Sequence, residues 1–325
     1  MSTDRGIHAK KVRNIPWAGW KEVLKRVKDK MESKNIPIMA AGVAFYFFLS
    51  LFPALLAIVT LYTFITDPLL VREHLEELSK IMPPDVHEFI TEKIMNIVGA
   101  TDNTRTWGLA LSFIIGLGSA NKGTLMLFRA INEIYDEQDD RNMILQNLIT
   151  LGVTLGLMIV GILCMFMLIA YPMMREFIEL NGTIESIIAF SRWIVLAVVF
   201  LFCVALIYQF APQRSRPKFN WVSTGAIIAT ILWVIGSLLL TVYIKNFDKI
   251  EDLYGQISAL IVMMIWLNIT ALVVLLGAQI NAELEHQTDA DTTHGEEKPI
   301  GERHAYFADH VADKEDEEEE IKKDK

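Results

Sequence analysis

Charged side chains are absent from six long stretches of this 325-residue chain. A helix needs roughly 20 apolar residues, each rising about 1.5 Å, to cross the hydrocarbon of a bilayer. Four stretches exceed that length, the fourth along the chain just meets it, and the second is shorter unless a lysine joins it. The absence of charge therefore predicts a polytopic membrane protein. The stretches lie between Lys34 and Asp67, Arg105 and Lys122, Arg141 and Arg175, Arg192 and Arg214, Lys218 and Lys245, and Asp252 and Glu283.

Several catalytic signatures are also missing from the sequence. No Asp or Glu lies within the six stretches, which argues against a simple carboxylate proton relay. No glycine-rich phosphate loop ends in Lys-Ser or Lys-Thr, so ATP is not expected as a direct driver. No paired histidines occur at ligand spacing, so metal-dependent hydrolysis has no visible site. Cysteine is scarce: Cys164 and Cys203 lie in apolar stretches and are expected to be packed thiols. We therefore expect no enzyme, no cofactor and no metal site.

The residues that are present predict an all-α protein in three parts. Residues 1–35 form a basic segment, residues 36–284 a six-helix transmembrane domain, and residues 285–325 an acidic tail expected to be disordered because it is polar and poor in aromatics. The start is polar for over thirty residues, so the first span, rather than a cleaved signal peptide, is expected to direct insertion. The spans are expected at about 36–66, 106–131, 144–171, 193–211, 220–244 and 256–282.

The distribution of Lys and Arg predicts the orientation. Three cations, Arg214, Arg216 and Lys218, crowd the short connection after the fourth span, on the same side as the basic N-terminal segment. By the positive-inside rule both termini are expected in the cytoplasm. On the other side, residues 67–105 carry apolar residues at helical spacing before and after a Pro-Pro pair at 83–84. They predict two short amphipathic helices on the outer face, and a substrate-gating lid is the alternative interpretation.

The second span contains an unusual lysine. If the helix is straight, Lys122 lies about 22 Å into roughly 30 Å of hydrocarbon. It either snorkels to the inner headgroups or, if the helix breaks at Gly116, Gly118 and Gly123, faces an anionic substrate or lipid head together with Asn121. Snorkelling is the favoured interpretation because only one charge requires an explanation.

Hydroxyl and amide groups in the fifth and sixth spans are further candidates for a polar pathway or for helix packing. In the sixth span Asn268 and Gln279 share one face, whereas Asn281 points elsewhere. Packing is the favoured role of the hydroxyls because small residues ordinarily lie at helix interfaces in membranes. The hydroxyl residues on one face of the fifth span are Ser223, Thr230, Ser237 and Thr241.

Short motifs in a fixed order cover the region from about residue 20 to residue 285. They are AAGVAFY at 40–46, LSLFP at 49–53, NKG at 121–123, RAINEIY at 129–135, LYG at 253–255 and LGAQINA at 276–282. In order and spacing they resemble the YihY/BrkB family, once labelled ribonuclease BN. The resemblance implies a six-helix protein of the bacterial cytoplasmic membrane. That family usually carries an acidic residue where this chain has Gln279, so any ion coupling by that carboxylate is expected to be missing here.

These patterns favour a transporter, channel-like or lipid-handling protein of unknown substrate. The alternatives are a membrane scaffold whose charged tails recruit cytoplasmic partners or anionic lipid, and a membrane-bound enzyme acting on lipid or RNA. The expected partners are membrane lipids and a small-molecule or lipid substrate, with no nucleic acid, because a basic patch beside a first span more often contacts lipid. The spacing of Gly152 and Gly156 permits a homo-oligomer without requiring one.

Overall fold

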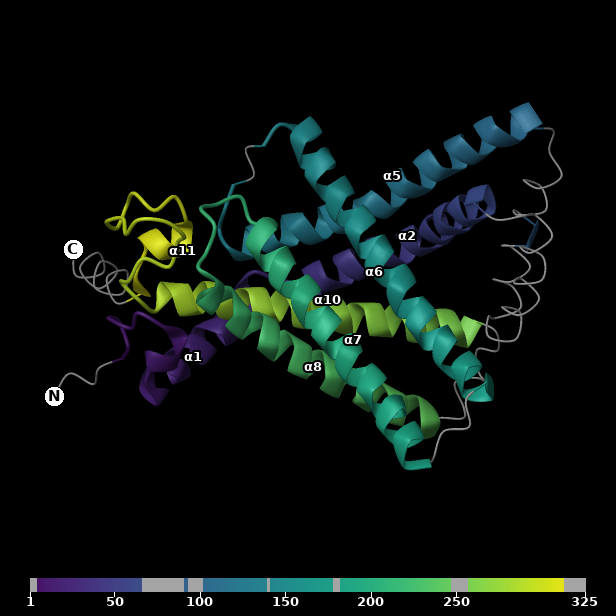
Figure 1. Cartoon of the computed structure of the whole chain (residues 1–325). Helices are drawn as coiled ribbons and strands as arrows, with labels where there is room; N and C mark the ends of the chain where they lie inside the picture. The colour runs from purple at the N-terminus through teal and green to yellow at the C-terminus, as the bar shows by residue number, and fades with distance from the viewer. Residues whose placement is uncertain are drawn as a thin grey trace.

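In a computed structural model the chain forms a bundle of long helices, with both termini at one end (Figure 1). The structure describes residues 5–65, 91–92, 102–138, 141–177, 182–246 and 257–312. Within these ranges the only β-structure is an isolated bridge between Pro217 and Thr293, so the all-α prediction is confirmed. The elements are η1 (Val12–Asn14), α1 (Trp17–Ser33), α2 (Ile36–Ile65), α5 (Asp102–Ile134), α6 (Met143–Phe177), α7 (Gly182–Phe210), α8 (Phe219–Asn246), α10 (Ile257–His286) and α11 (Tyr306–Asp309).

Six of these helices, α2, α5, α6, α7, α8 and α10, overlap the predicted spans. Among the described residues, four segments are long and apolar enough to cross a membrane: Met143–Cys164, Trp193–Phe210, Trp221–Lys245 and Ser258–His286. A fifth results if α1 and the first half of α2, bent by 64° relative to each other, form one broken span. Helix α5 is not among these four segments, and it carries the cations Lys122 and Arg129 within its length. The coarse architecture is thus multi-span, and the number six stays a prediction.

The bend between α1 and α2 is made at Asn35, whose φ of 51° is left-handed. Asparagine tolerates this conformation better than most residues. The preceding Lys34 turns its ammonium group to the end of α5, where Nζ donates to the carbonyls of Glu133 (2.8 Å) and Ile134 (3.1 Å) and contacts Asp136 Oδ1 (2.7 Å). A cation here stabilises the C-terminus of α5 because the last carbonyls of a helix carry partial negative charge.

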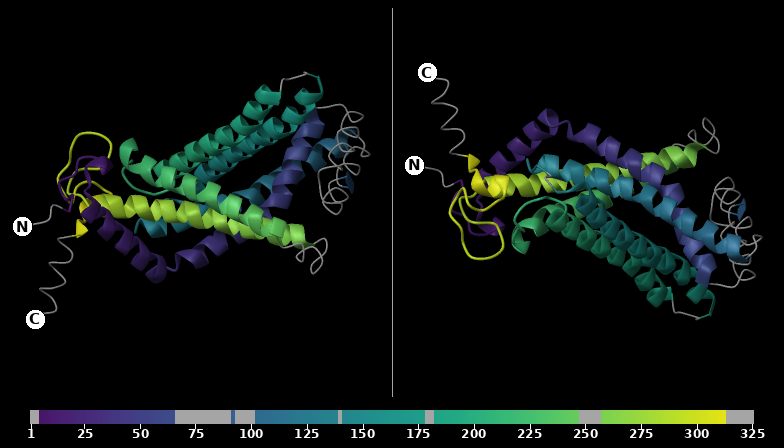
Figure 2. Two further views of the ribbon diagram at one scale, coloured as in Figure 1. Left: turned by 90° about the horizontal axis from the view of Figure 1, so that it is seen from below. Right: turned by 90° about the horizontal axis from the view of Figure 1, so that it is seen from above.

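The helices pack closely near the termini and diverge away from them (Figure 2). Helix α10 shows the change along its own length. Residues 271–286 are all buried apart from Leu272 and Leu276, whereas none of residues 258–270 is buried. Helix α7 changes in the same direction, with Val204, Ala205 and Tyr208 buried near its C-terminal end. We call the closely packed part the terminal end of the bundle.

A contact between two glycines fixes the crossing of α8 and α10 at the terminal end. A Cβ atom added to Gly225 would lie 2.2 Å from the carbonyl oxygen of Gly277, and one added to Gly277 would lie 2.7 Å from that of Gly225. Asn281 of α10 completes the contact: its Oδ1 accepts from Gly225 N (2.7 Å) and its Nδ2 donates to Val222 O (3.1 Å). Small residues allow this approach, and the amide adds hydrogen bonds that lipid cannot supply.

The expectation for the C-terminal tail needs correction, and the expectation for the outer segment falls mostly outside the described residues. The tail was expected to be disordered from residue 285, yet residues 285–312 fold back on the bundle and bury Thr288, Arg303 and Phe307. Composition suggested disorder, but these residues gain hydrogen-bond partners from segments distant in sequence. Residues 313–325 lie outside the described residues. So does most of the expected outer helical segment 67–105, of which only 91–92 and the start of α5 are described.

Candidate functional site: a polar seam and a buried charge network

Helices α5 and α6 meet through hydroxyl and amide groups, which we call the polar seam. Its members are Asn121 and Thr124 of α5 and Gln146, Thr150 and Thr154 of α6, all buried. The Thr154 hydroxyl has three acceptors within reach: Thr124 Oγ1 (2.8 Å) and Asn121 Oδ1 (3.3 Å) on α5, and Thr150 O (2.8 Å) on its own helix. A hydroxyl donates one proton and accepts through two lone pairs, so Thr154 can donate to Thr150 O while accepting from Thr124, or donate across the seam to Thr124 or Asn121.

On α6, the polar side chains face the neighbouring helix and the apolar side chains face outward, the reverse of a helix in a water-soluble protein. Gln146, Thr150 and Thr154 follow one another at four-residue steps and therefore lie on one face, which is turned toward α5. The opposite faces expose large apolar side chains, including Ile144, Leu148, Ile159 and Leu163. A helix with polar groups inside and aliphatic groups outside is stable in lipid, where unpaired polar groups are costly.

A buried ion pair connects the loop after α7 to the end of α10. Arg214 Nη1 and Nη2 donate to the Glu285 carboxylate at 2.5 and 2.7 Å, and the two side chains are 1% and 0% exposed. The Arg214 guanidinium lies 4.2 Å from the centre of the Tyr135 ring, and Thr292 donates to the same carboxylate (3.3 Å). Burial opposes the charge of Arg214, but the adjacent Glu285 raises its pKa above the ordinary value.

A second ion pair connects α1 to α10 two residues earlier, at Glu283. Arg26 Nε donates to Glu283 Oε2 (2.7 Å), and its Nη2 donates to Gln287 Oε1 (2.6 Å). Gln279 Nε2 donates to the other oxygen of Glu283 (3.0 Å). A carboxylate at position 279 would place a second negative charge beside Glu283 and lose this hydrogen bond. We call these two ion pairs with their hydrogen-bond partners the terminal network.

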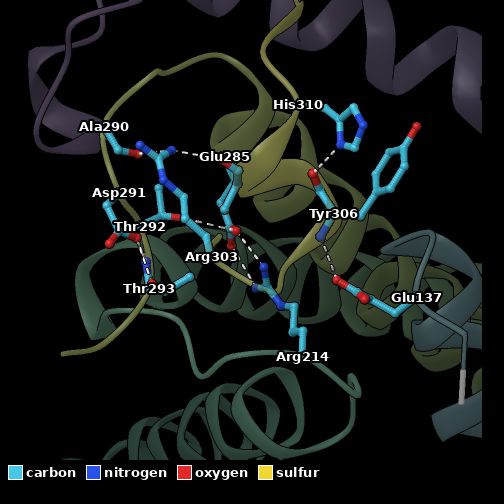
Figure 3. A network of polar contacts seen from close by, with 11 residues as sticks. Glu137, Arg214, Glu285, Ala290, Asp291, Thr292, Thr293, Arg303, Tyr306 and His310 are labelled. Atoms are coloured by element: carbon cyan, nitrogen blue, oxygen red, sulfur yellow. Dashed lines mark hydrogen bonds and ion pairs between the residues drawn. The ribbon is translucent and has the colours of Figure 1, made fainter. Parts of the chain in front are cut away.

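The segment after α10 is organised by a buried arginine (Figure 3). Arg303 donates to the carbonyl oxygens of Ala308 (2.6 Å), Asp289 (2.7 Å), Lys298 (3.1 Å) and Ala290 (3.3 Å). Its five N–H groups in a planar fork suit a ring of carbonyls of this kind. The arginine thereby closes residues 289–308 into a compact loop on the terminal end of the bundle.

The N-terminal segment interlocks with this loop. Thr288 Oγ1 lies within hydrogen-bond distance of the carbonyl oxygens of Ile7 (3.0 Å) and Ala9 (2.9 Å), and the backbone N–H of Asp289 donates to Ile7 O (2.8 Å). His8 Nδ1 lies 2.7 Å from Asp289 Oδ2. The two ends of the chain are thus bonded to each other, and neither forms a separate charged tail over the described residues.

The predicted site residues fall in different places. Asn121 belongs to the seam, whereas the adjacent Lys122 is exposed on α5. In α8, Thr230 bonds its own helix at Ala226 O (2.8 Å) and Ser237 accepts from Trp266 Nε1 of α10 (3.3 Å). The remaining candidates are the partly exposed Ser223 and Asn268, the exposed Thr241, and the fully buried Gln279 and Asn281.

Gly152 and Gly156 of α6, whose spacing permits a homo-oligomer, have no neighbour within 4 Å of an added Cβ atom in this chain, and the oligomer stays a prediction. The residues that sequence reasoning did not identify are Thr124, Gln146, Thr150 and Thr154 of the seam. The three residues of α6 gave a signal, a polar stripe at four-residue steps in an otherwise aliphatic span. The partners of Arg214 and Arg26 gave no signal, because they lie 71 and 257 residues away.

An all-helical bundle with aliphatic outer faces and polar inter-helix contacts is a multi-pass membrane protein. The chain belongs to the family described as virulence factor BrkB, whose model matches residues 27–301, so the resemblance drawn from its motifs is confirmed.

Two kinds of relative illustrate the match. The chain is 31% identical over 252 residues to the ribonuclease-like protein YfkH of Bacillus subtilis (strain 168), covering 75% of this chain and 88% of YfkH. It is 25% identical over 270 residues to a UPF0761 membrane protein of Alteromonas mediterranea, covering 80% and 85%. It is 26% identical over 265 residues to one of Psychromonas ingrahamii, covering 79% and 85%. No solved structure matches the chain.

Proposed function

We propose that this protein is a transporter of the cytoplasmic membrane that moves an amphipathic, lipid-like substrate. The observation that carries the proposal is the polar seam, which joins α6 to α5 in a bundle whose described side chains are buried mainly at the terminal end. Alternating access requires one group of helices to move against another around such a contact. The seam is neutral, and the six apolar stretches that form the predicted spans contain no Asp or Glu. A substrate with neutral polar groups and apolar chains fits these surfaces better than a bare ion.

The Thr154 hydroxyl supports a moving contact. Its proton has acceptors of equal distance, 2.8 Å, on Thr124 across the seam and on the backbone of its own helix. Donation to Thr150 O keeps the Thr154 proton paired when α6 separates from α5, which lowers the cost of that movement in lipid. Meanwhile the terminal network holds α1 and the loop after α7 against the end of α10, and α6 and the rest of α7 move.

The test is flux through purified protein in liposomes, with a panel of labelled phospholipids, lipid-linked anions and small metabolites. We expect wild-type protein to move one class of lipid-like substrate, and Thr154→Val to slow it several-fold, because a hydrogen bond between membrane helices contributes about 0.6 to 1.7 kcal/mol. Thr241→Val removes the same hydroxyl from an exposed site on α8 and is expected to leave the rate unchanged. Absence of flux across the whole panel would reject the proposal.

We further propose that both termini lie in the cytoplasm. The terminal end exposes the cations Lys10, Lys11, Arg13, Lys21 and Lys25. Short segments rich in Lys and Arg stay on the cytoplasmic side of a membrane. A single cysteine at position 10, in a Cys164→Ala/Cys203→Ala background, should resist a membrane-impermeant thiol reagent in intact cells and react after permeabilisation. Labelling in intact cells contradicts this orientation.

The scaffold function is a second candidate, favoured by the same exposed cations. Deleting the N-terminal segment is a poor test, because Ala9, Val12 and Ile15 belong to the packed core. Neutralising exposed lysines such as Lys21 and Lys25 to Gln keeps the core and removes the charge. A scaffold would lose its partners in this variant, whereas a transporter would keep its flux.

We also propose that the chain is not a ribonuclease, although the Bacillus relative carries a ribonuclease-like name. Among the residues that the structure places, no three His, Cys, Asp or Glu side chains are arranged to hold a metal ion. Incubation of the pure protein with RNA and Mg²⁺, Mn²⁺ or Zn²⁺ should leave the RNA intact. Cleavage that one substitution abolishes would overturn this proposal.

A further inference from the structure

A basic hollow lies at the terminal end, apart from the seam and the terminal network. It has a volume of about 390 Å³ and is lined by Lys11, Val12, Arg13, Trp20 and Thr224. These residues come from η1 and the lysine just before it, from α1 and from the second turn of α8. Two cations, an indole and a hydroxyl around one hollow match the chemistry of a phosphate ester attached to an apolar group.

The cations are held in place by the residues between them. Ala9, Val12 and Ile15 recur at three-residue steps and pack against Trp221, Ile280 and Leu284, a cluster that Trp20 also contacts. Their neighbours Lys11 and Arg13 are therefore kept on the outer side of η1, where both are exposed. Within the described ranges neither forms an ion pair, so both charges are available to a ligand.

The hollow lies at the depth of lipid headgroups. Trp221 is the first residue of the apolar segment of α8, and Thr224 follows three residues later. At 1.5 Å per residue, Thr224 is about 4.5 Å beyond the start of that segment. Tryptophan and exposed lysines, here Trp17 and Lys21 of α1, are typical of the same interfacial layer.

An exposed apolar stripe begins at the hollow and runs down α8. Ile227, Ile231, Ile235 and Leu238 follow Thr224 at steps of three and four residues, and all four are 47% to 61% exposed. These steps place them on one face, below the cations. A free phosphate ion gains nothing from an apolar stripe, whereas the acyl chains of a phospholipid can pack against it.

We propose that this hollow binds the phosphate headgroup of an anionic phospholipid of the adjacent leaflet. Lys11 and Arg13 contact the phosphate, Thr224 donates a hydrogen bond, and the acyl chains lie along the isoleucine stripe of α8. The site does not depend on the transport proposal, because it requires only that α8 crosses the membrane.

Native mass spectrometry of the full chain in detergent, titrated with phosphatidylglycerol or phosphatidylcholine, tests the site. We expect one phosphatidylglycerol to bind more tightly than phosphatidylcholine. Lys11→Gln/Arg13→Gln should weaken it about 30-fold, about fivefold for each cation removed near an anionic lipid. The matched control, Lys21→Gln/Lys25→Gln, removes the same charge from the exposed face of α1 outside the hollow and should change binding less than threefold. Both pairs are exposed, so unfolding temperatures should match the wild type.

Three results would overturn the proposal. Equal weakening in the two double variants would indicate a diffuse basic surface. Displacement of the lipid by inorganic phosphate or glycerol phosphate at equal concentration would identify a soluble phosphate as the ligand. Binding seen only after removal of residues 313–325 would show that the acidic run at 315–320 occupies the cations instead.

Discussion

The two ends of the bundle are built differently from the same helices. At the terminal end, residues 271–286 of α10 are almost all buried, and they include Glu283 and Glu285, each with an arginine partner. Over residues 258–270 of the same helix nothing is buried. Tight packing and charge pairing thus fix α10 to its neighbours at the terminal end, whereas residues 258–270 of the same helix have fewer buried contacts to break. The contrast suits a protein that keeps one end closed while the helices move at the other.

The largest effect is expected where a buried charge loses its partner. Arg214→Gln leaves the Glu285 carboxylate, which is 0% exposed, without its cation. Removing one partner of a buried ion pair costs about 3 to 5 kcal/mol. We expect a lower unfolding temperature in detergent and faster proteolysis of residues 285–312.

The double variant Arg214→Met/Glu285→Met provides the control for this prediction. Replacing both partners by apolar residues of similar length removes the unpaired charge, and such replacements are often neutral or stabilising. We therefore expect it to recover most of the lost stability. If Arg214→Gln unfolds like the wild type, the terminal network does not hold the closed end together.

A smaller effect is expected from adding one methyl group to a glycine. Gly225→Ala would bring a Cβ atom to 2.2 Å from the Gly277 carbonyl oxygen, so α8 and α10 must separate. Overpacking of this kind costs about 1 to 3 kcal/mol. The matched variant is Gly156→Ala on α6, where nothing lies within 4 Å, and its unfolding temperature should equal or exceed that of the wild type. If the two variants unfold alike, the close contact of α8 and α10 adds no stability.

The helices could be predicted from the sequence, but their ends could not. The fourth span was expected at 193–211, and α7 begins eleven residues earlier, at Gly182. Glu185 and Arg192 interrupt the apolar run without interrupting the helix, because charges mark the edge of the hydrocarbon and a helix continues into the headgroup layer. The same reasoning explains why α5 begins at Asp102, before the expected start at 106.

The seam was partly predictable and the terminal network was not. Asn121 was identified because it adjoins a lysine in an apolar span, and the stripe of Gln146, Thr150 and Thr154 follows helical spacing. The pair of Arg214 with Glu285 depends on how distant segments meet, which local periodicity does not report. Composition misled for residues 285–312, since a polar segment can be ordered when another segment supplies its hydrogen-bond partners.

The smallest expected effect concerns acid sensitivity of the loop that closes the terminal end. Burial works against the charge of Asp291, but hydrogen bonds from the Thr293 hydroxyl (2.6 Å) and from the backbone N–H groups of Lys298 and Thr293 (2.8 Å each) lower its pKa. A carboxyl group with a lowered pKa stabilises the fold above its ordinary pKa of about 3.9, and the contribution is lost as the pH falls through the lowered value. Wild-type protein should therefore lose protection of residues 289–308 in hydrogen exchange only below about pH 4. Asp291→Asn should show reduced protection at neutral pH and less additional loss in acid, because its side chain has no charge to titrate. Equal pH profiles for the two proteins would show that other groups cause the acid sensitivity, and that the loop is held by Arg303 without help from Asp291.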